Sequence, residues 1–127
     1  MKSVVLMLAL IPAMAGAAEW KKVFGDYEYD VYVDTTRIER AGDSVQAWVQ
    51  QHFTQERDAG DFFYNILTGL NSFDCLHKKV HLLQVEVYMD DKLLEAHKAS
   101  RSGGNRPIIP GTVEHFAYKY LCAAKQK

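Results

Sequence analysis

The feature that constrains this chain most is a single pair of cysteines, Cys75 and Cys122, behind an N-terminal segment with the form of a secretory leader. Disulfides form and persist in oxidising compartments, so an exported chain with two cysteines is expected to join them. The bridge would close a loop of about 48 residues and remove chain entropy worth about 4 kcal/mol from the unfolded state. A metal-binding pair or a catalytic thiol is the rival interpretation, although neither cysteine has a CxxC partner or an activating neighbour.

The N-terminus has the three parts of a secretory leader. Lys2 supplies the positive charge, residues 4–11 form an apolar run, and Pro12 ends that run just before the small residues 13–18. We expect cleavage after Ala17. A retained membrane anchor is the alternative, but the apolar run is shorter than the roughly 20 residues that a spanning helix requires. The leader has no cysteine at its end, so a lipoprotein anchor has no residue to modify.

Removal of a signal peptide of residues 1–17 leaves residues 18–127, which is enough chain for a single domain with a modest core. Hydrophobic residues make up 48% of the sequence and aromatic residues 12%, so a folded domain is expected rather than a disordered one. The formal net charge is −1 at pH 7, whereas a nucleic-acid-binding domain normally shows a strong basic excess. We therefore expect no nucleic-acid partner, and no integral membrane segment after cleavage.

Alternating side chains predict most of the secondary structure. In residues 27–34, tyrosines and valines occupy one face and carboxylates the other, which is typical of a half-buried strand. The same reasoning predicts strands at residues 27–34, 45–53, 62–67, 81–89 and 93–99. Residues 54–61 are polar and contain a glycine, so they are expected to form a loop. Strands that follow one another through short turns indicate an antiparallel meander of about five to six strands.

The last segment changes from the period of a strand to that of a helix. Pro110 and Gly111 interrupt the chain, and Thr112 is suited to cap a helix. Apolar residues then recur at helical spacing: Val113, Phe116, Ala117, Tyr120, Leu121 and Ala124. The predicted fold class is α+β, with one C-terminal helix packed on the sheet and tied to it by the Cys75–Cys122 disulfide. Cys122 lies about 180° from the apolar stripe, so either the helix loosens near its end or Cys75 reaches its flank.

No catalytic or metal-binding constellation can be assembled from the sequence. His77 and His81 are four residues apart, but two imidazoles without a third ligand are ordinary surface residues. No nucleophile, base and orienting group occur in a recognisable pattern, so we expect neither an enzyme nor a cofactor. Asp26, Asp30 and Asp34 recur at even spacing and are interpreted as the solvated face of a strand.

A basic cluster flanks the glycine-containing segment of residues 100–110, which we expect to be a mobile surface loop. Lys98, Arg101 and Arg106 make up this cluster, and their charge is suited to contact with an acidic partner. They are the candidate partner-binding residues.

The chain resembles the surface-adhesin protein E family of Gram-negative bacteria. The resemblance rests on elements that recur in order along the chain: Trp20, residues 32–40 (YVDTTRIER) followed by Gly42, Trp48, the pair Asp74-Cys75, residues 109–112 (IPGT) and Cys122. It implies an antiparallel sheet with a C-terminal helix held to it by a disulfide. It also implies adhesion, since relatives bind host extracellular-matrix proteins at the cell surface and can dimerise. The adhesin itself resembles a lipid-anchored protein, whereas this leader lacks the anchor cysteine.

The leading hypothesis is a non-enzymatic, disulfide-stapled binding domain that is exported to the periplasm, the cell surface or the medium. Its partner would be a protein, such as a host matrix protein, and an open edge strand would allow a homodimer to form. The alternative is a periplasmic inhibitor or accessory factor that acts on an envelope enzyme such as a lysozyme or protease.

Overall fold

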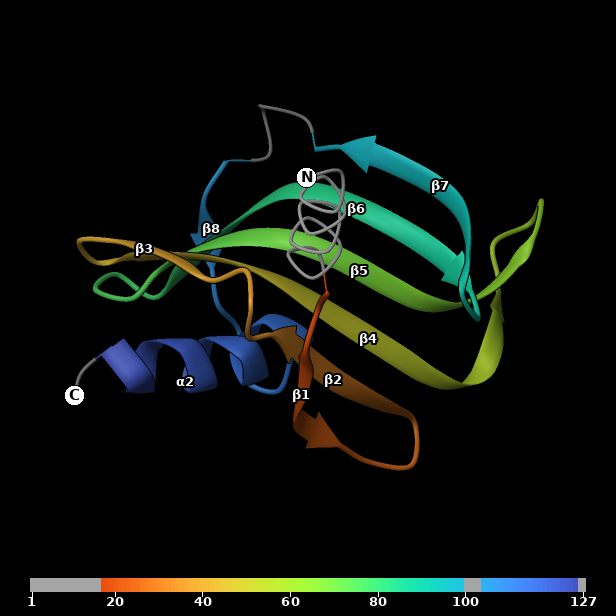
Figure 1. Ribbon diagram of the computed structural model, residues 1–127, viewed down its shortest axis with the longest axis horizontal. Helices are drawn as coiled ribbons and strands as arrows, with labels where there is room; N and C mark the ends of the chain where they lie inside the picture. Colours follow the sequence, from red (N-terminus) through yellow and green to blue (C-terminus); the bar gives the residue numbers. More distant parts are fainter. Residues whose placement is uncertain (1–16, 100–103, 126–127) are drawn as a thin grey trace, which may run out of the picture.

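The computed structural model describes residues 17–99 and 104–125, in which an antiparallel sheet packs against a C-terminal helix (Figure 1). The eight strands of these residues are β1 (Trp20–Gly25), β2 (Tyr29–Asp34), β3 (Glu39–Ala41), β4 (Ser44–Asp58), β5 (Phe63–Asp74), β6 (Lys79–Met89), β7 (Lys92–Lys98) and β8 (Arg106–Pro107). The helix is α2 (Val113–Lys125). None of the helices in the described residues is long and apolar enough to cross a membrane.

Neighbouring strands of the sheet follow one another along most of the chain. Their order is β1-β2-β4-β5-β6-β7, and every pairing is antiparallel. Two short strands lie outside this path, where β3 pairs with β4 and β8 pairs with β6. The predicted sheet and its C-terminal helix are thus confirmed, but the sheet has eight strands rather than five to six.

The buried core lies between α2 and one face of the sheet. The helix contacts β1, β2 and β4, as Figure 1 shows. The buried apolar side chains are Val31, Val33, Val45, Ala47, Val49, Phe73, Val80, Ala117, Leu121 and Cys122. They alternate along β2 and β4, so one face of each strand packs on the helix. At the edge of this core, the Phe24 ring stacks on the Phe116 ring with 3.7 Å between their centroids.

The helix begins where the sequence predicts. The Thr112 hydroxyl accepts a hydrogen bond from the His115 backbone N–H at 3.3 Å, so Thr112 caps the first turn. The N–H of Gly111 in turn donates to Nδ1 of His115 at 3.1 Å. Gly111 has a φ of +87°, a left-handed conformation that glycine adopts without strain.

The predicted disulfide between Cys75 and Cys122 is confirmed. Their sulfur atoms are bonded and their Cα atoms lie 5.6 Å apart. The helix does not loosen before Cys122, because α2 continues to Lys125. Cys75 instead lies in the turn directly after β5 and reaches the flank of the helix, where the Tyr118 hydroxyl donates to the Cys75 carbonyl oxygen at 3.3 Å. The bridge therefore joins the end of β5 to the last turns of α2.

Several strand boundaries differ from the prediction. Residues 54–58 were expected to form a loop, but they continue β4 and are exposed. After a register shift, Arg57 pairs with Tyr64 and Asp58 with Phe63 of β5, so this part of the strand needs no apolar face. Strand β5 likewise extends beyond the predicted residues 62–67. Alternation of apolar and polar residues indicates a strand only where one face is buried. It does not indicate a strand whose two faces are both exposed to solvent.

Three strands are absent from the prediction. Strand β1 carries a register shift between Lys22 and Phe24, which breaks its alternation. Strands β3 and β8 span three and two residues and are too short to show a period. The predicted leader, except for Ala17, lies outside the described part of the chain, as do residues 100–103 of the glycine-containing loop. The rest of that predicted loop, residues 104–110, contains β8, which pairs with β6.

Candidate binding site

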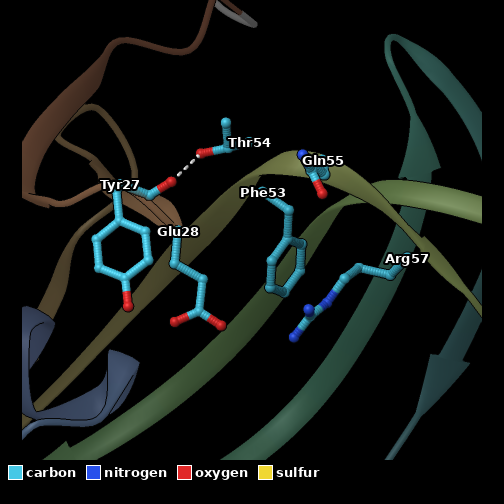
Figure 2. Close-up of a pocket in the computed structure, with 6 residues that line it drawn as sticks. All are labelled: Tyr27, Glu28, Phe53, Thr54, Gln55 and Arg57. Atoms are coloured by element: carbon cyan, nitrogen blue, oxygen red, sulfur yellow. Dashed lines mark hydrogen bonds between the residues drawn. The ribbon is translucent and has the colours of Figure 1, made fainter.

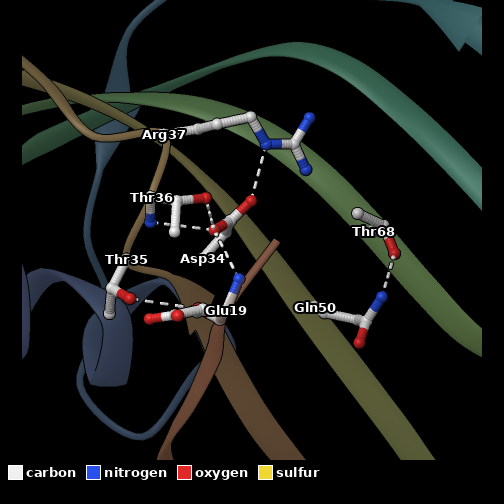
Figure 3. Close-up of polar contacts among 7 residues, drawn as sticks. All are labelled: Glu19, Asp34, Thr35, Thr36, Arg37, Gln50 and Thr68. Carbon is white, nitrogen blue, oxygen red and sulfur yellow. Dashed lines mark hydrogen bonds and ion pairs between the residues drawn. The ribbon is translucent and has the colours of Figure 1, made fainter. Parts of the chain in front are cut away.

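A buried carboxylate, Asp34, fixes the segment that follows β2 (Figure 3). Its Oδ1 accepts hydrogen bonds from the Thr36 N–H at 2.9 Å, the Thr36 hydroxyl at 2.7 Å and the Glu19 N–H at 3.2 Å. Its Oδ2 accepts one from Nε of Arg37 at 2.6 Å. Asp34 is 0% exposed, so the interpretation of this residue as part of a solvated face is wrong. Local polar groups replace the water that the carboxylate loses.

The hydrogen bonds keep Asp34 ionised despite its burial. Burial alone raises the pKa of a carboxyl, and here the hydrogen bonds from Thr36, Arg37 and the Glu19 N–H more than offset it, so the pKa of Asp34 lies below its usual value. The Arg37 guanidinium also lies over the Trp48 ring, with 5.2 Å between its Cζ and the ring centroid. This segment therefore supports the fold, and the charge of Arg37 is paired with that of Asp34.

A second polar and aromatic cluster lies at the far end of the sheet (Figure 2). There, a cavity of about 350 Å³ lies between the turn that joins β1 to β2 and the far part of β4. We call it the end cavity, and its lining residues are Tyr27, Glu28, Phe53, Thr54, Gln55 and Arg57. It combines two aromatic rings with one carboxylate and one guanidinium, which are the groups that recognise ligands on protein surfaces.

The turn that carries Tyr27 is held by hydrogen bonds. Oδ1 of Asp26 accepts from the backbone N–H of Glu28 at 2.8 Å and of Tyr29 at 2.9 Å. The Thr54 hydroxyl donates to the Tyr27 carbonyl oxygen at 2.9 Å, and the Thr54 N–H donates to the Glu28 carbonyl oxygen at 3.0 Å. Tyr27 is nevertheless 90% exposed. A large aromatic side chain is thus displayed to solvent on a well-fixed backbone.

Phe53 forms the opposite wall of the end cavity. Its ring makes edge contacts with Tyr29 and Tyr64, at centroid distances of 6.0 and 6.1 Å. The Arg57 guanidinium covers the ring, with 4.5 Å between Cζ and the ring centroid. Because the register of β2 and β4 pairs Tyr29 with Phe53, it also brings Tyr27 to this wall. The cavity is therefore assembled from segments more than 20 residues apart.

A larger groove of about 430 Å³ lies beside the start of α2. Its floor is mainly apolar and includes Leu67, Leu82 and Val85. The side chain of Asn71 also lines it, and its Oδ1 is buried without a hydrogen-bond partner among the described residues. This groove marks where the helix stops covering the sheet.

Two of the three predicted partner-binding residues lie in strands that pair with β6: Lys98 in β7 and Arg106 in β8. Lys98 pairs with Gln84, on the sheet face away from α2, and Arg106 pairs with Val80, which is buried under α2. Directly paired residues share a face, so these two basic side chains point to opposite faces. Arg106 also forms an ion pair with Glu114 at 3.4 Å. Arg101 lies outside the described residues.

The end cavity is not predicted by the sequence. Alternation places Tyr27 in a strand and residues 54–61 in a loop, so it does not indicate that Tyr27 and Arg57 line one cavity. A local signal was present, because Asp26 precedes Tyr27 at a position suited to an aspartate-stabilised turn, which displays the residue after it. Among the described residues, no group of three or more histidines, cysteines and carboxylates could hold a metal ion.

The fold and the end cavity define a small disulfide-stapled β-domain with an exposed aromatic surface. A family model for surface-adhesin protein E matches residues 20–123, so the chain belongs to that family. A search of the curated proteins found no match to the chain. Membership suggests an exported protein with a surface-adhesin role, and it implies a non-enzymatic function.

Proposed function

We propose that this chain is a non-enzymatic binding domain that attaches to a protein outside the cell, such as a host extracellular-matrix protein. The observation that carries the proposal is the end cavity, where Tyr27 is 90% exposed on a turn held by four hydrogen bonds. Family membership supports the same role. The alternative of an inhibitor or accessory factor for an envelope enzyme has no support from the comparisons.

The chemistry of the end cavity suits a protein partner. Tyrosine and arginine are enriched among the residues that contribute most to protein interfaces, because each combines a large apolar surface with polar groups. Tyr27 and Arg57 are both present here, on two walls of one cavity. A backbone that is fixed before binding also loses less entropy when a partner docks. The end cavity is thus better suited to recognition than an equally exposed but isolated side chain.

The proposal is tested by binding of the exported protein to an immobilised basement-membrane matrix. We expect Tyr27→Ala to weaken binding by about tenfold or more, as is usual for the loss of a central interface aromatic. Leu76→Ala is the matched control, since Leu76 is 65% exposed in the turn after β5, at the opposite end of the sheet. Equal binding by both variants and the parent protein would contradict the proposal.

The site of action is a separate proposal. We propose that the leader is removed after Ala17 and that the protein acts at the cell surface or in the medium. The mass of the exported protein reports leader removal, lipid attachment and cysteine oxidation together. Protein that stays in the periplasm and is never accessible to protease on intact cells cannot be an adhesin, and would favour the inhibitor hypothesis.

The basic residues remain a proposed second contact, for an acidic partner. Their positions predict that Lys98 and Arg106 act on different faces, so Lys98→Ala and Arg106→Ala should have independent effects on binding to the matrix, while Arg101→Ala tests the third residue. Unchanged binding in all three variants would remove this contact. We also propose that the outer strand β7 can pair with a second copy, which a concentration-dependent mass in sedimentation would reveal.

A further inference from the structure

The end cavity contains a carboxylate that the fold leaves unpaired. Glu28 is exposed, and among the described residues its carboxylate accepts no hydrogen bond and forms no ion pair. Figure 2 shows this carboxylate between the Tyr27 ring and the Phe53 ring. Its own backbone N–H is bound to Asp26 and its carbonyl oxygen to Thr54, so the residue is fixed while its charge is free.

The surroundings of the end cavity are acidic. The lining itself carries one carboxylate, Glu28, and one guanidinium, Arg57. The charged residues that directly flank the lining positions are all acidic: Asp26, Glu56 and Asp58. An excess of one charge at a concave surface attracts ligands of the opposite charge. Charge complementarity therefore favours a cation.

The cavity already holds one cation of its own. The Arg57 guanidinium covers the Phe53 ring at 4.5 Å and forms no ion pair with a carboxylate among the described residues. Tyr27 has no comparable cation over its ring, and no ring contact, in the part of the chain that the structure describes. A cation from outside would thus meet Tyr27 and Glu28 on one side and the positive charge of Arg57 on the other.

We propose that the end cavity receives the side chain of a lysine or arginine from a basic segment of the partner protein. This inference rests on the proposed function. The charged head lies beside the Glu28 carboxylate, and the methylene groups pack against the Tyr27 ring. Arg57 repels the inserted cation and so weakens this one contact. The group that enters the end cavity is consequently a protruding basic side chain of the partner protein rather than an acidic side chain or a neutral sugar.

The test is a titration of the ¹⁵N-labelled exported protein with butylammonium, which represents a lysine side chain. We expect saturable shifts of the amide signals of Tyr27, Glu28 and Thr54, and no comparable shifts with the uncharged probe 1-pentanol. Glu28→Gln should weaken butylammonium binding by about fivefold, as expected for loss of an exposed charge contact. Glu39→Gln is the control, because Glu39 is an exposed carboxylate of β3, which pairs with the opposite end of β4.

The sign of the effect at Arg57 discriminates between ligands. Arg57→Gln should strengthen butylammonium binding about twofold to fivefold because it removes a repulsive charge. An anion would bind more weakly to the same variant, and a sugar that hydrogen-bonds both charged residues would lose affinity in both variants. Weaker butylammonium binding by Arg57→Gln, equal effects of Glu28→Gln and Glu39→Gln, or equal shifts with 1-pentanol would each overturn the inference.

The same variants separate this inference from the proposed function. If Tyr27→Ala abolishes binding to the matrix while Glu28→Gln leaves it unchanged, the domain is an adhesin but its partner does not insert a cation, and the inference is overturned. If butylammonium binds as expected while neither substitution alters matrix binding, the proposed function fails and the partner assignment fails with it. Loss of matrix binding in both variants, with normal binding by Glu39→Gln, supports both.

Discussion

Strand β4 connects two regions of the sheet that differ in burial and in backbone pairing. At its start, Val45, Ala47 and Val49 alternate into the core under α2 and are almost completely buried. At its end, residues 54–58 are exposed, and Arg57 lines the end cavity. The first part pairs regularly with β5, and the far part pairs with it at Arg57 and Asp58, after a register shift. The helix-covered core thus holds the sheet together, and the end cavity extends the same sheet without a core of its own.

This comparison separates stability from recognition within one small domain. The disulfide, the Asp34 hydrogen bonds and the Phe24–Phe116 stack all lie on the side of the helix-covered core. The end cavity is held mainly by hydrogen bonds of a turn and by ring edges, which contribute less to stability than buried apolar area does. Residues of the end cavity can therefore change with little effect on the fold, whereas residues of the core cannot.

The largest expected effect concerns two phenylalanines of β5. Phe73 is 0% exposed under the helix, and Phe63 is 56% exposed at the other end of the strand. We expect Phe73→Ala to lower the free energy of unfolding by about 3–5 kcal/mol and Phe63→Ala by less than about 1 kcal/mol. Urea denaturation followed by circular dichroism measures both. If Phe73→Ala does not fold, Phe73→Leu provides the smaller change. Equal losses at the two positions would show that the far end of the sheet contributes as much to stability as the helix-covered core does.

Removal of the disulfide should have the next largest effect. The bridge closes a loop with a sequence separation of 47 residues, so the double variant Cys75→Ser, Cys122→Ser should lose about 3–4 kcal/mol of unfolding free energy. The parent protein after reduction is the matched control and should lose a similar amount. A loss below about 1 kcal/mol in both samples would show that α2 is held by packing alone.

The third prediction concerns the buried carboxylate. Asp34→Asn keeps the size of the side chain but weakens the acceptor for Arg37 and places an amide N–H among donors, so we expect a loss of about 2–3 kcal/mol in unfolding free energy. Asp30→Asn is the control. Asp30 pairs with Lys22 at 3.4 Å near the surface and should contribute less than about 1 kcal/mol. Thermal unfolding of both variants measures the two losses of stability. Similar losses would contradict the expectation that the buried carboxylate contributes more than the one near the surface.

The dependence of stability on pH follows from the direction of the Asp34 shift. Its pKa in the folded protein is below the unfolded value of about 3.9, so the stabilisation is fully present above that value and is lost as pH falls through the folded pKa. Asp74 titrates in the same direction, because hydrogen bonds from the backbone and side chain of His77 lower its pKa. Between about pH 4 and pH 2, the free energy of unfolding should therefore fall by less in Asp34→Asn than in the parent protein. Asp74→Asn still contains Asp34, so it should still show the part of the decrease that Asp34 causes. Parallel pH profiles for Asp34→Asn and the parent would show that Asp34 does not titrate on unfolding.

The sequence predicts the helix-covered core better than the end cavity, for a physical reason. Burial imposes a period, so alternation in β2 and β4 and helical spacing in α2 are visible in the residues themselves, as are the Thr112 cap and the cysteine pair. Burial of Asp34 is not visible, because it depends on how Thr36 and Arg37 turn back toward it. The end cavity depends on the register that pairs Tyr29 with Phe53, and register is a long-range property that residue types along one strand do not show.

The smallest expected effect on stability is the most informative about function. Tyr27 is 90% exposed and contributes its backbone rather than its ring to the turn, so Tyr27→Ala should change the free energy of unfolding by less than about 0.5 kcal/mol. If the same variant loses matrix binding, the loss cannot be attributed to unfolding, because the core is unchanged. A stability loss above about 1.5 kcal/mol would instead make Tyr27 part of the structure. The two regions along β4 would then be one cooperative unit, and the aromatic ring would have a structural reason for its position.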